Sequence, residues 1–165
     1  MRRWAALLLP FALTACGLHP LYAGGSHGVV AQTLGAIQVE PIAGQAGWLM
    51  RNALTDRLGV GGTSAPRYKL IVELDDQIAG LGIRADNTVT RERRTLRARF
   101  RLVDADAAAA TRLDATAGSD TGIDVVSSDY ATVAAEQTAL ENLTDDVADQ
   151  IVARLALYAQ RTEKH

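Results

Sequence analysis

Residues 68–78 read YKLIVELDDQI, and residues 89–103 read VTRERRTLRARFRLV. Apolar side chains recur at every second position in both stretches, from Tyr68 in the first and from Leu96 in the second. This period of two is typical of a β-strand that packs one face against a core and exposes the other to water. Residues 80–87 form the turn between the two strands, so the sequence predicts a hairpin.

Segments on both sides of this hairpin predict the rest of a sheet. Residues 34–42 (LGAIQVEPI) alternate well enough for a first strand, which Pro41 ends. Residues 111–117 predict a shorter and weaker fourth strand. We expect residues 118–128 to be a polar connection that leaves the sheet.

Two helices complete the predicted fold. One spans residues 48–58, with an apolar face expected to comprise Trp48, Leu49, Ala53 and Leu58. The other spans residues 130–160, and Ser128 or Asp129 can cap it. Its apolar stripe comprises Val133, Leu140, Leu143, Val147, Ile151, Leu155 and Tyr158. This order of elements predicts an α+β two-layer sandwich, with two helices packed on one face of a mostly antiparallel four-stranded sheet.

The start of the chain has the pattern of a secretory signal. Two arginines precede an apolar run, residues 5–13, which is too short to span a bilayer. Two small residues then precede Cys16, the only cysteine in the chain, and this arrangement resembles the lipobox of bacterial lipoproteins. The resemblance implies cleavage before Cys16, a thioether-linked diacylglycerol and N-acylation, for example with palmitate. Several acyl chains together hold a protein durably on a membrane.

The chain therefore divides into three predicted parts. Residues 1–15 are a signal peptide, residues 16–31 a lipidated tether, and residues 32–165 one domain long enough to bury a core. Gly17, where the lipoprotein sorting rule would place Asp for retention, indicates the periplasmic face of the outer membrane. Without the signal, 15 basic residues face 19 acidic ones, a net charge of −4. This balance argues against a nucleic-acid binder.

Residues suited to catalysis are scarce. His19 and His27 fall in the tether and His165 is the last residue, so none supplies a base for a hydrolytic triad. One cysteine and scattered histidines do not make a metal site. The sequence therefore predicts a protein that is not an enzyme and holds no metal or cofactor.

The strand at 89–103 carries an unusual charge pattern. Its polar face holds Arg91, Arg93, Arg97, Arg99 and Arg101. The acids expected on neighbouring strands, Glu73, Asp75 and Asp114, are too few to neutralise them. Three readings stay open: an ordinary solvated and paired face, a docking face for a protein partner, or contact with phosphates, which arginine binds in a bidentate manner.

Three features resemble the LptE family of lipopolysaccharide-assembly lipoproteins. Residues 16–22 (CGLHPLY) are similar to the family's Cys-Gly-aromatic-x-Pro-Leu-Tyr opening, with Leu18 where phenylalanine is usual. Residues 51–58 (RNALTDRL) are similar to the helix after the family's first strand. The order of elements, with its long final helix, covers nearly the whole mature chain.

The resemblance implies a non-enzymatic role at the outer membrane. The family's member plugs the LptD β-barrel, one copy per barrel, helps it to assemble, and assists insertion of lipopolysaccharide into the outer leaflet. The turn between the second and third strands lies where the family's proposed lipopolysaccharide contact sits. The candidate residues for contact with lipopolysaccharide or the barrel are Arg84, Arg91, Arg93, Arg97 and Arg99.

Other functions stay open. A lipid-anchored module of another envelope machine, such as a transport-auxiliary lipoprotein or an activator of a cell-wall synthase, fits the same tether and fold. A lipoprotein hydrolase is opposed by the lack of a positioned base. The final helix is acidic between Glu136 and Asp149, so we do not expect that surface to approach anionic lipid.

Overall fold

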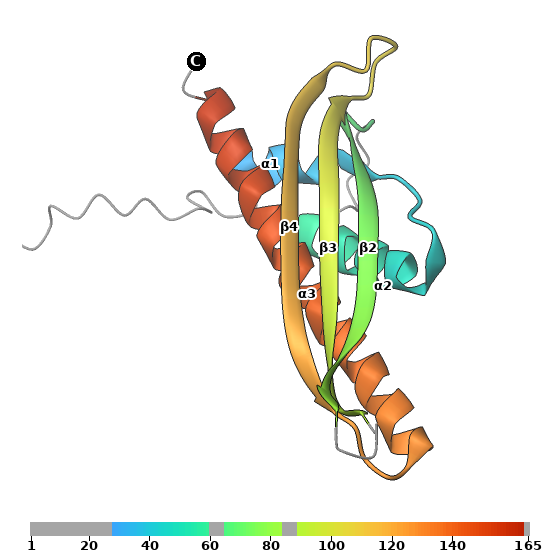
Figure 1. Ribbon diagram of the computed structural model, residues 1–165. Helices are drawn as coiled ribbons and strands as arrows, with labels where there is room; N and C mark the ends of the chain where they lie inside the picture. The colour runs from blue at the N-terminus through green and yellow to red at the C-terminus, as the bar shows by residue number, and fades with distance from the viewer. Residues whose placement is uncertain (1–27, 60–64, 84–88, 164–165) are drawn as a thin grey trace, which may run out of the picture.

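The computed structural model describes residues 28–59, 65–83 and 89–163 (Figure 1). The elements along the chain are α1 (Val29–Gly35), β1 (Ile37–Val39), α2 (Gly44–Leu58), β2 (Tyr68–Ile83), β3 (Val89–Asp104), β4 (Thr111–Asp124) and α3 (Asp129–Glu163). The strands lie in the order β1-β2-β3-β4, with β1 and β2 parallel and the other neighbours antiparallel. The predicted α+β class and mostly antiparallel four-stranded sheet are confirmed.

The β2–β3 hairpin is the longest pairing in the sheet. Its register runs from Tyr68 opposite Asp104 to Ile83 opposite Val89, with irregularities only near Gly80 and Gly82. Alternate residues of both strands point into the core, as the period of two predicted. The fully buried members include Leu70, Leu96 and Phe100.

Helices cover one face of the sheet, while the other face, toward the viewer in Figure 1, has no helix over it in the described chain. α3 crosses behind the strands diagonally, and α2 lies beside it. Gln45 donates to Gln137 at 2.8 Å near the start of α2, and Arg57 near its end bonds Asp145 and Asp149. The two helices therefore run in the same direction. None of the described helices has both the length and the apolarity that crossing a bilayer requires.

Two elements at the start of the domain differ from their predictions. The expected strand at 34–42 is only β1, Ile37–Val39, and α1 precedes it as a third helix. Val30 and Leu34 of α1 are buried in the core, so the spacing of these two residues is helical and not alternating.

The predicted apolar face of α2 is wrong at Trp48, whereas Leu58 is buried and Leu49 and Ala53 are partly buried against the core, as predicted. Met50, Leu54 and Leu58 are buried, whereas Trp48 is 64% exposed. Gly47 explains the rotation, because a Cβ there would lie 2.6 Å from the carbonyl oxygen of Ile42. The chain before α2 thus packs on the glycine, which points that side of the helix inward and turns Trp48 to the surface.

The prediction for the start of α3 is wrong at Val133. This residue is 61% exposed, and the first buried residue of α3 is Ala139. The first turns lie beside the end of the sheet and not on its covered face (Figure 1). The predicted stripe from Leu140 onward is buried, with Tyr158 partly so.

β4 is longer than predicted and reaches Asp124. Gly118 and Gly122 fall in the predicted polar connection, but both lie within the strand, opposite Arg97 and Arg93. A Cβ on Gly118 would lie 3.4 Å from Cγ of Arg97, and one on Gly122 would lie 3.2 Å from the guanidinium of Arg91. These glycines therefore make room for arginine side chains that lean across from β3.

Candidate functional site

The uncovered face of the sheet, called the outer face below, carries the arginine row of β3. Arg97, Arg99 and Arg101 alternate with fully buried residues of the strand, and Arg91 and Arg93 alternate with the partly buried Glu92 and Arg94. β2 places Glu73 and Asp75 opposite Arg99 and Arg97. β4 places Asp114 opposite Arg101 and Asp124 opposite Arg91. The row is thus flanked by acids on both neighbouring strands.

Four of the five arginines form ion pairs. On one half of the face, Arg99 bonds Asp114 at 2.9 Å and Arg101 bonds Glu73 at 3.3 Å. On the other half, the pairs are Arg91–Asp124 at 3.6 Å and Arg93–Asp120 at 3.5 Å. All eight side chains are at least 40% exposed, so solvent screens these pairs and each adds little to stability.

Asp120 and Asp124 were missed by the sequence analysis, which placed them in a connection. Because β4 continues through them, they supply two of the four pairs. The expected surplus of positive charge on this face is correspondingly smaller. The alternation of Asp120, Gly122 and Asp124 continues the even-numbered polar positions of β4, and this period could have revealed them.

The ion pair between Arg99 and Asp114 shifts the pKa values of both side chains. The hydrogen bond from Arg99 and its positive charge lower the pKa of the Asp114 carboxyl, and the same contact raises the pKa of Arg99. Arg112 lowers the pKa of Asp104 in the same way, again first through a hydrogen bond. Both carboxylates therefore stay ionised to a lower pH than an unpaired aspartate would.

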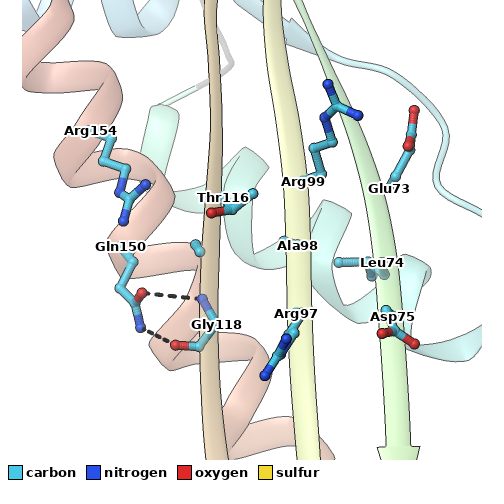
Figure 2. Close-up of a pocket in the computed structure, with 11 residues that line it drawn as sticks. Glu73, Leu74, Asp75, Arg97, Ala98, Arg99, Thr116, Gly118, Gln150 and Arg154 are labelled. Atoms are coloured by element: carbon cyan, nitrogen blue, oxygen red, sulfur yellow. Dashed lines mark hydrogen bonds between the residues drawn. The ribbon is translucent and has the colours of Figure 1, made fainter.

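Arg97 differs from its four neighbours. It makes no ion pair with any acid in the described part of the chain, and Asp75 opposite it accepts instead from Gln77. Arg97 lines a shallow hollow of about 650 Å³ in the middle of the outer face, which the described residues of α3 border through Gln150 and Arg154. Figure 2 shows this hollow extending from β2 across β3 to α3.

Gln150 of α3 lines the hollow where it reaches β4, the edge strand of the sheet. Its side-chain amide donates to the carbonyl oxygen of Gly118 at 3.1 Å and accepts from the Gly118 N–H at 3.3 Å (Figure 2). An edge strand leaves such backbone groups unpaired and open to association. Gln150 thus satisfies the backbone of β4 at one residue and joins it to α3.

A second arginine environment lies on the covered face. Arg94 forms a two-pronged contact with Asp76, with Nε to Oδ1 at 2.8 Å, and donates to the carbonyl oxygen of Glu136 on α3 at 2.8 Å. The Arg94 side chain is only 11% exposed, and the Asp76 contact raises its pKa. Nearby on the same face, one carboxylate oxygen of Glu92 is buried without a partner among the described residues. Sequence reasoning missed this cluster, although Asp76 interrupts the apolar positions of its strand.

The structure places only part of the predicted site. It describes Arg91, Arg93, Arg97 and Arg99 on one face, while Arg84 and Cys16 lie outside the described residues. The three histidines also lie outside them. Within the described ranges, no three His, Cys, Asp or Glu side chains gather as metal ligands would.

A comparison with protein families identifies the chain. The sequence profile of the family LptE, described as lipopolysaccharide-assembly, matches residues 34–155. The chain belongs to the LptE family. This match includes all four strands, α2 and most of α3. No curated protein sequence matches the chain.

Solved structures share the LptE-like fold. The protein in a crystal structure from Caulobacter crescentus CB15 is 27% identical in sequence to this chain, with a TM-score of 0.68. The match covers 82% of this chain and 98% of that one. A minor lipoprotein from Acinetobacter baumannii is 16% identical, with a TM-score of 0.54, over 73% of this chain and 90% of its own. Rare lipoprotein B from Shewanella oneidensis is 11% identical, with a TM-score of 0.53, over 78% of this chain and 98% of its own. At these lower identities the likeness concerns the fold alone.

Family membership assigns the general role. The protein is a lipopolysaccharide-assembly lipoprotein of the outer membrane and works with the lipopolysaccharide transport machinery. The LptE family is a non-enzymatic assembly family.

Proposed function

We propose that this protein plugs the lumen of an LptD-type β-barrel, helps the barrel to assemble, and assists insertion of lipopolysaccharide into the outer leaflet without catalysis. The observation that carries this proposal, beyond family membership, is the character of the outer face. Charges of both signs alternate on it, and Arg97, Arg99 and Asp114 are exposed there. The lumen of an outer-membrane barrel is polar, so a plug needs a polar surface where it meets the wall.

The proposal includes the lipid anchor. Acylation of Cys16 holds the mature chain at the periplasmic face of the outer membrane, and residues 16–27 connect it to the described domain. Twelve extended residues reach at most about 40 Å. The domain can therefore enter a barrel while its anchor stays in the surrounding bilayer.

The contact residues in this proposal are Arg84, Arg91, Arg93, Arg97 and Arg99. Arg97 is the strongest member, because its guanidinium has no acidic partner in the described part of the chain and lines the hollow. The paired arginines can exchange their partners at low cost, since exposed ion pairs contribute little. Phosphates of lipopolysaccharide or acidic groups on the barrel wall are both suitable partners for a planar guanidinium.

The test is affinity purification of the tagged, lipidated protein from its own outer membrane in mild detergent. Mass spectrometry should find an LptD-like barrel in equal amount, with lipopolysaccharide bound to the complex. Recovery of a transporter or a peptidoglycan synthase without a barrel would instead favour a module of another envelope machine. Depletion of the protein should reduce lipopolysaccharide at the cell surface.

The variant Arg97→Glu separates the three readings of the outer face. Loss of bound lipopolysaccharide with the barrel retained indicates a phosphate contact, and loss of the barrel indicates a docking contact. Arg51→Glu is the matched control, because Arg51 is an exposed helical arginine on α2, away from this face. If both variants behave as the unmodified protein, the outer face is an ordinary solvated surface and its role in the proposal is wrong.

A further inference from the structure

The last three turns of α3 carry a stripe that differs from the rest of the helix. Arg154, Leu157, Tyr158 and Arg161 follow a spacing of three, four and seven residues, which places them on one side of the helix. Leu157 is 44% exposed, and both arginines are exposed. These four residues, here called the α3 stripe, combine an apolar centre with a cation at each end.

A small cavity accompanies the α3 stripe. It measures about 180 Å³ and is lined by the four stripe residues and Leu113 of β4. Neither Arg154 nor Arg161 makes an ion pair with any carboxylate whose side chain the structure describes. The guanidinium groups are therefore available to an external anion beside an apolar recess.

Charge changes sign along α3 at this point. Acids are frequent from Asp129 to Asp149, and none follows until Glu163. The helix dipole favours a cation in the last turn, which accounts for Arg161, but Arg154 lies more than two turns before the end of the helix. The position of Arg154 therefore needs another explanation.

Neighbouring elements place two further arginines and two aspartates at the same end of the molecule. Arg67 is exposed where β2 begins. Arg112 of β4 pairs with Asp104, which is the main cause of its raised pKa, and the nearby Tyr158 and Tyr68 raise that pKa further. Asp104 is engaged by Arg112 at 2.6 Å, and Asp106 accepts from backbone N–H groups of its own turn. The acids at this end are thus occupied locally.

The chain also enters the described domain at this end. α1 packs against α3, and Figure 1 shows it beside the C-terminal half of that helix. Ala36, just after α1, accepts hydrogen bonds from the backbone N–H groups of Arg67 and Tyr68. A helix of seven residues is only about 10 Å long, so the described domain begins close to α3.

We propose that the α3 stripe docks on the surface of an anionic phospholipid bilayer, in the leaflet that holds the lipid anchor. Arg154 and Arg161 contact headgroup phosphates, while the exposed Leu157, beside the partly buried Tyr158, enters the boundary between headgroups and acyl chains. Basic residues that flank apolar ones on one helix face are suited to this interface. The anchor then holds the protein, and the stripe orients it. The inference rests on the lipid anchor of the proposed function.

The test uses the lipidated protein with an environment-sensitive fluorophore on Leu157→Cys. Thioether formation leaves Cys16 without a free thiol, so the label is unique. In vesicles of phosphatidylethanolamine and phosphatidylglycerol, we expect blue-shifted emission and quenching by brominated lipids. A label on Asn52→Cys, an exposed position of α2, should show neither. Vesicles of phosphatidylcholine alone, or high salt, should remove most of the effect.

Charge reversal identifies the residues responsible. Arg154→Glu with Arg161→Glu should reduce the docked fraction roughly tenfold or more, since each basic residue adds attraction to an anionic surface. Arg51→Glu should leave it unchanged, and Arg154→Gln with Arg161→Gln provides a milder pair if the reversal disturbs folding. The docking proposal would be overturned if the emission of the Leu157 label did not change with anionic lipid. It would also be overturned if Arg51→Glu and the stripe variants lost the docked fraction equally.

Flotation of the same vesicles separates failure of the docking from failure of the anchor. Protein that floats with an unresponsive Leu157 label contradicts the docking alone. Protein that does not float contradicts the anchor, and the docking that rests on it is overturned with it. Recovery of a barrel partner in the affinity purification does not depend on either result.

Discussion

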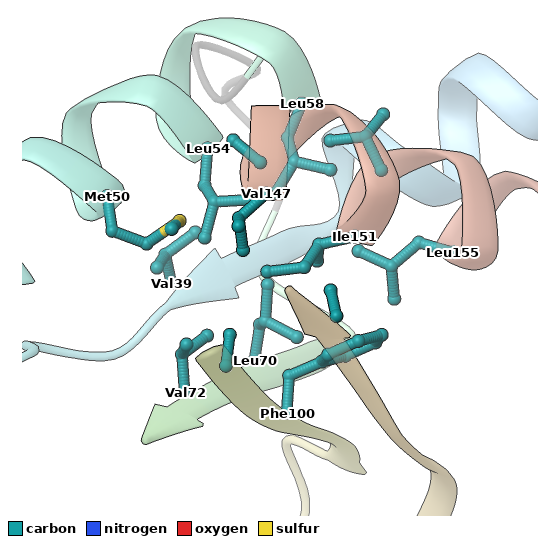
Figure 3. Close-up of a cluster of buried hydrophobic side chains, with 14 of the residues drawn as sticks. Val39, Met50, Leu54, Leu58, Leu70, Val72, Phe100, Val147, Ile151 and Leu155 are labelled. Atoms are coloured by element: carbon teal, nitrogen blue, oxygen red, sulfur yellow. The ribbon is translucent and has the colours of Figure 1, made fainter. Parts of the chain in front are cut away.

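The two faces of β3 place opposite demands on residues that are neighbours in sequence. Leu96, Ala98 and Phe100 are 0–1% exposed and pack against the helices, as Figure 3 shows for Phe100 among the core side chains. Arg97 and Arg99, between them, lie on a surface open to solvent. The covered face therefore carries the stability of the fold, and the outer face is free to be charged. This separation lets one strand serve both folding and contact with a partner.

The largest expected effect of a substitution is on the covered face. Phe100→Ala should lower the free energy of unfolding by about 3–5 kcal/mol, because it removes a fully buried ring and leaves a cavity. Urea denaturation followed by circular dichroism measures this. Arg99→Ala, one residue away, is the control and should lose far less. Similar losses for both variants would show that the outer face is part of the stabilising structure.

The next effect compares arginine pairs on the two faces. Arg94→Ala should cost about 1.5–3 kcal/mol, because it removes a charged hydrogen-bonding partner of Asp76 and the link to Glu136 of α3 in a site only 11% exposed. A double-mutant cycle with Asp76→Ala measures the coupling. The same cycle on Arg99 and Asp114 should give a clearly smaller coupling. Equal couplings would mean that burial does not distinguish the two pairs.

A smaller effect is expected at the border between the faces. Gln150→Ala should cost about 1 kcal/mol, since it removes two hydrogen bonds to the backbone of Gly118. Hydrogen exchange should show a faster Gly118 amide in the variant. Asn142→Ala, an exposed substitution on the same helix, should leave that amide unchanged. An unchanged Gly118 amide in Gln150→Ala would contradict the contact.

The smallest expected effect is on the pH dependence of folding stability. Asp104 and Asp114 have pKa values lowered by Arg112 and Arg99, so their ionised forms stabilise the folded state above the unfolded-state pKa, near about 4. This contribution should disappear as the pH falls through the lowered pKa values. Urea midpoints between pH 6 and about pH 2 should therefore fall less steeply in Asp104→Asn and Asp114→Asn. A steeper fall in either variant would contradict the sign of the shift.

The sequence predicted the parts of the fold that depend on local period. β2 and β3 alternate clearly, and the buried side of α3 from Leu140 follows a helical spacing, so these faces were predicted correctly, except at Ile78, which was placed inward and is 43% exposed. Trp48 was placed inward because it can share a helix face with Leu49, Ala53 and Leu58, whereas the contact between Gly47 and Ile42 sets the helix rotation. Such a contact between backbone groups leaves no apolar pattern to read.

The candidate site shows the same limit. The arginine row was visible from its alternation, but its partners Asp120 and Asp124 were not, because residues 118–128 were read as a polar connection. The contacts of Gly118 and Gly122 with arginine side chains explain why glycine stands at these two positions of the strand. The pair of Arg94 with Asp76 was missed for a related reason, since a diagonal contact between strands requires the register.

The central claim is that the outer face around Arg97 meets the partner that the proposed function requires. A photoreactive amino acid at position 97 of the lipidated protein, activated in living cells, tests it directly. The account predicts a crosslink to an LptD-like barrel or to lipopolysaccharide that depends on irradiation. A correctly anchored and folded protein that gives no crosslink at position 97 would contradict it.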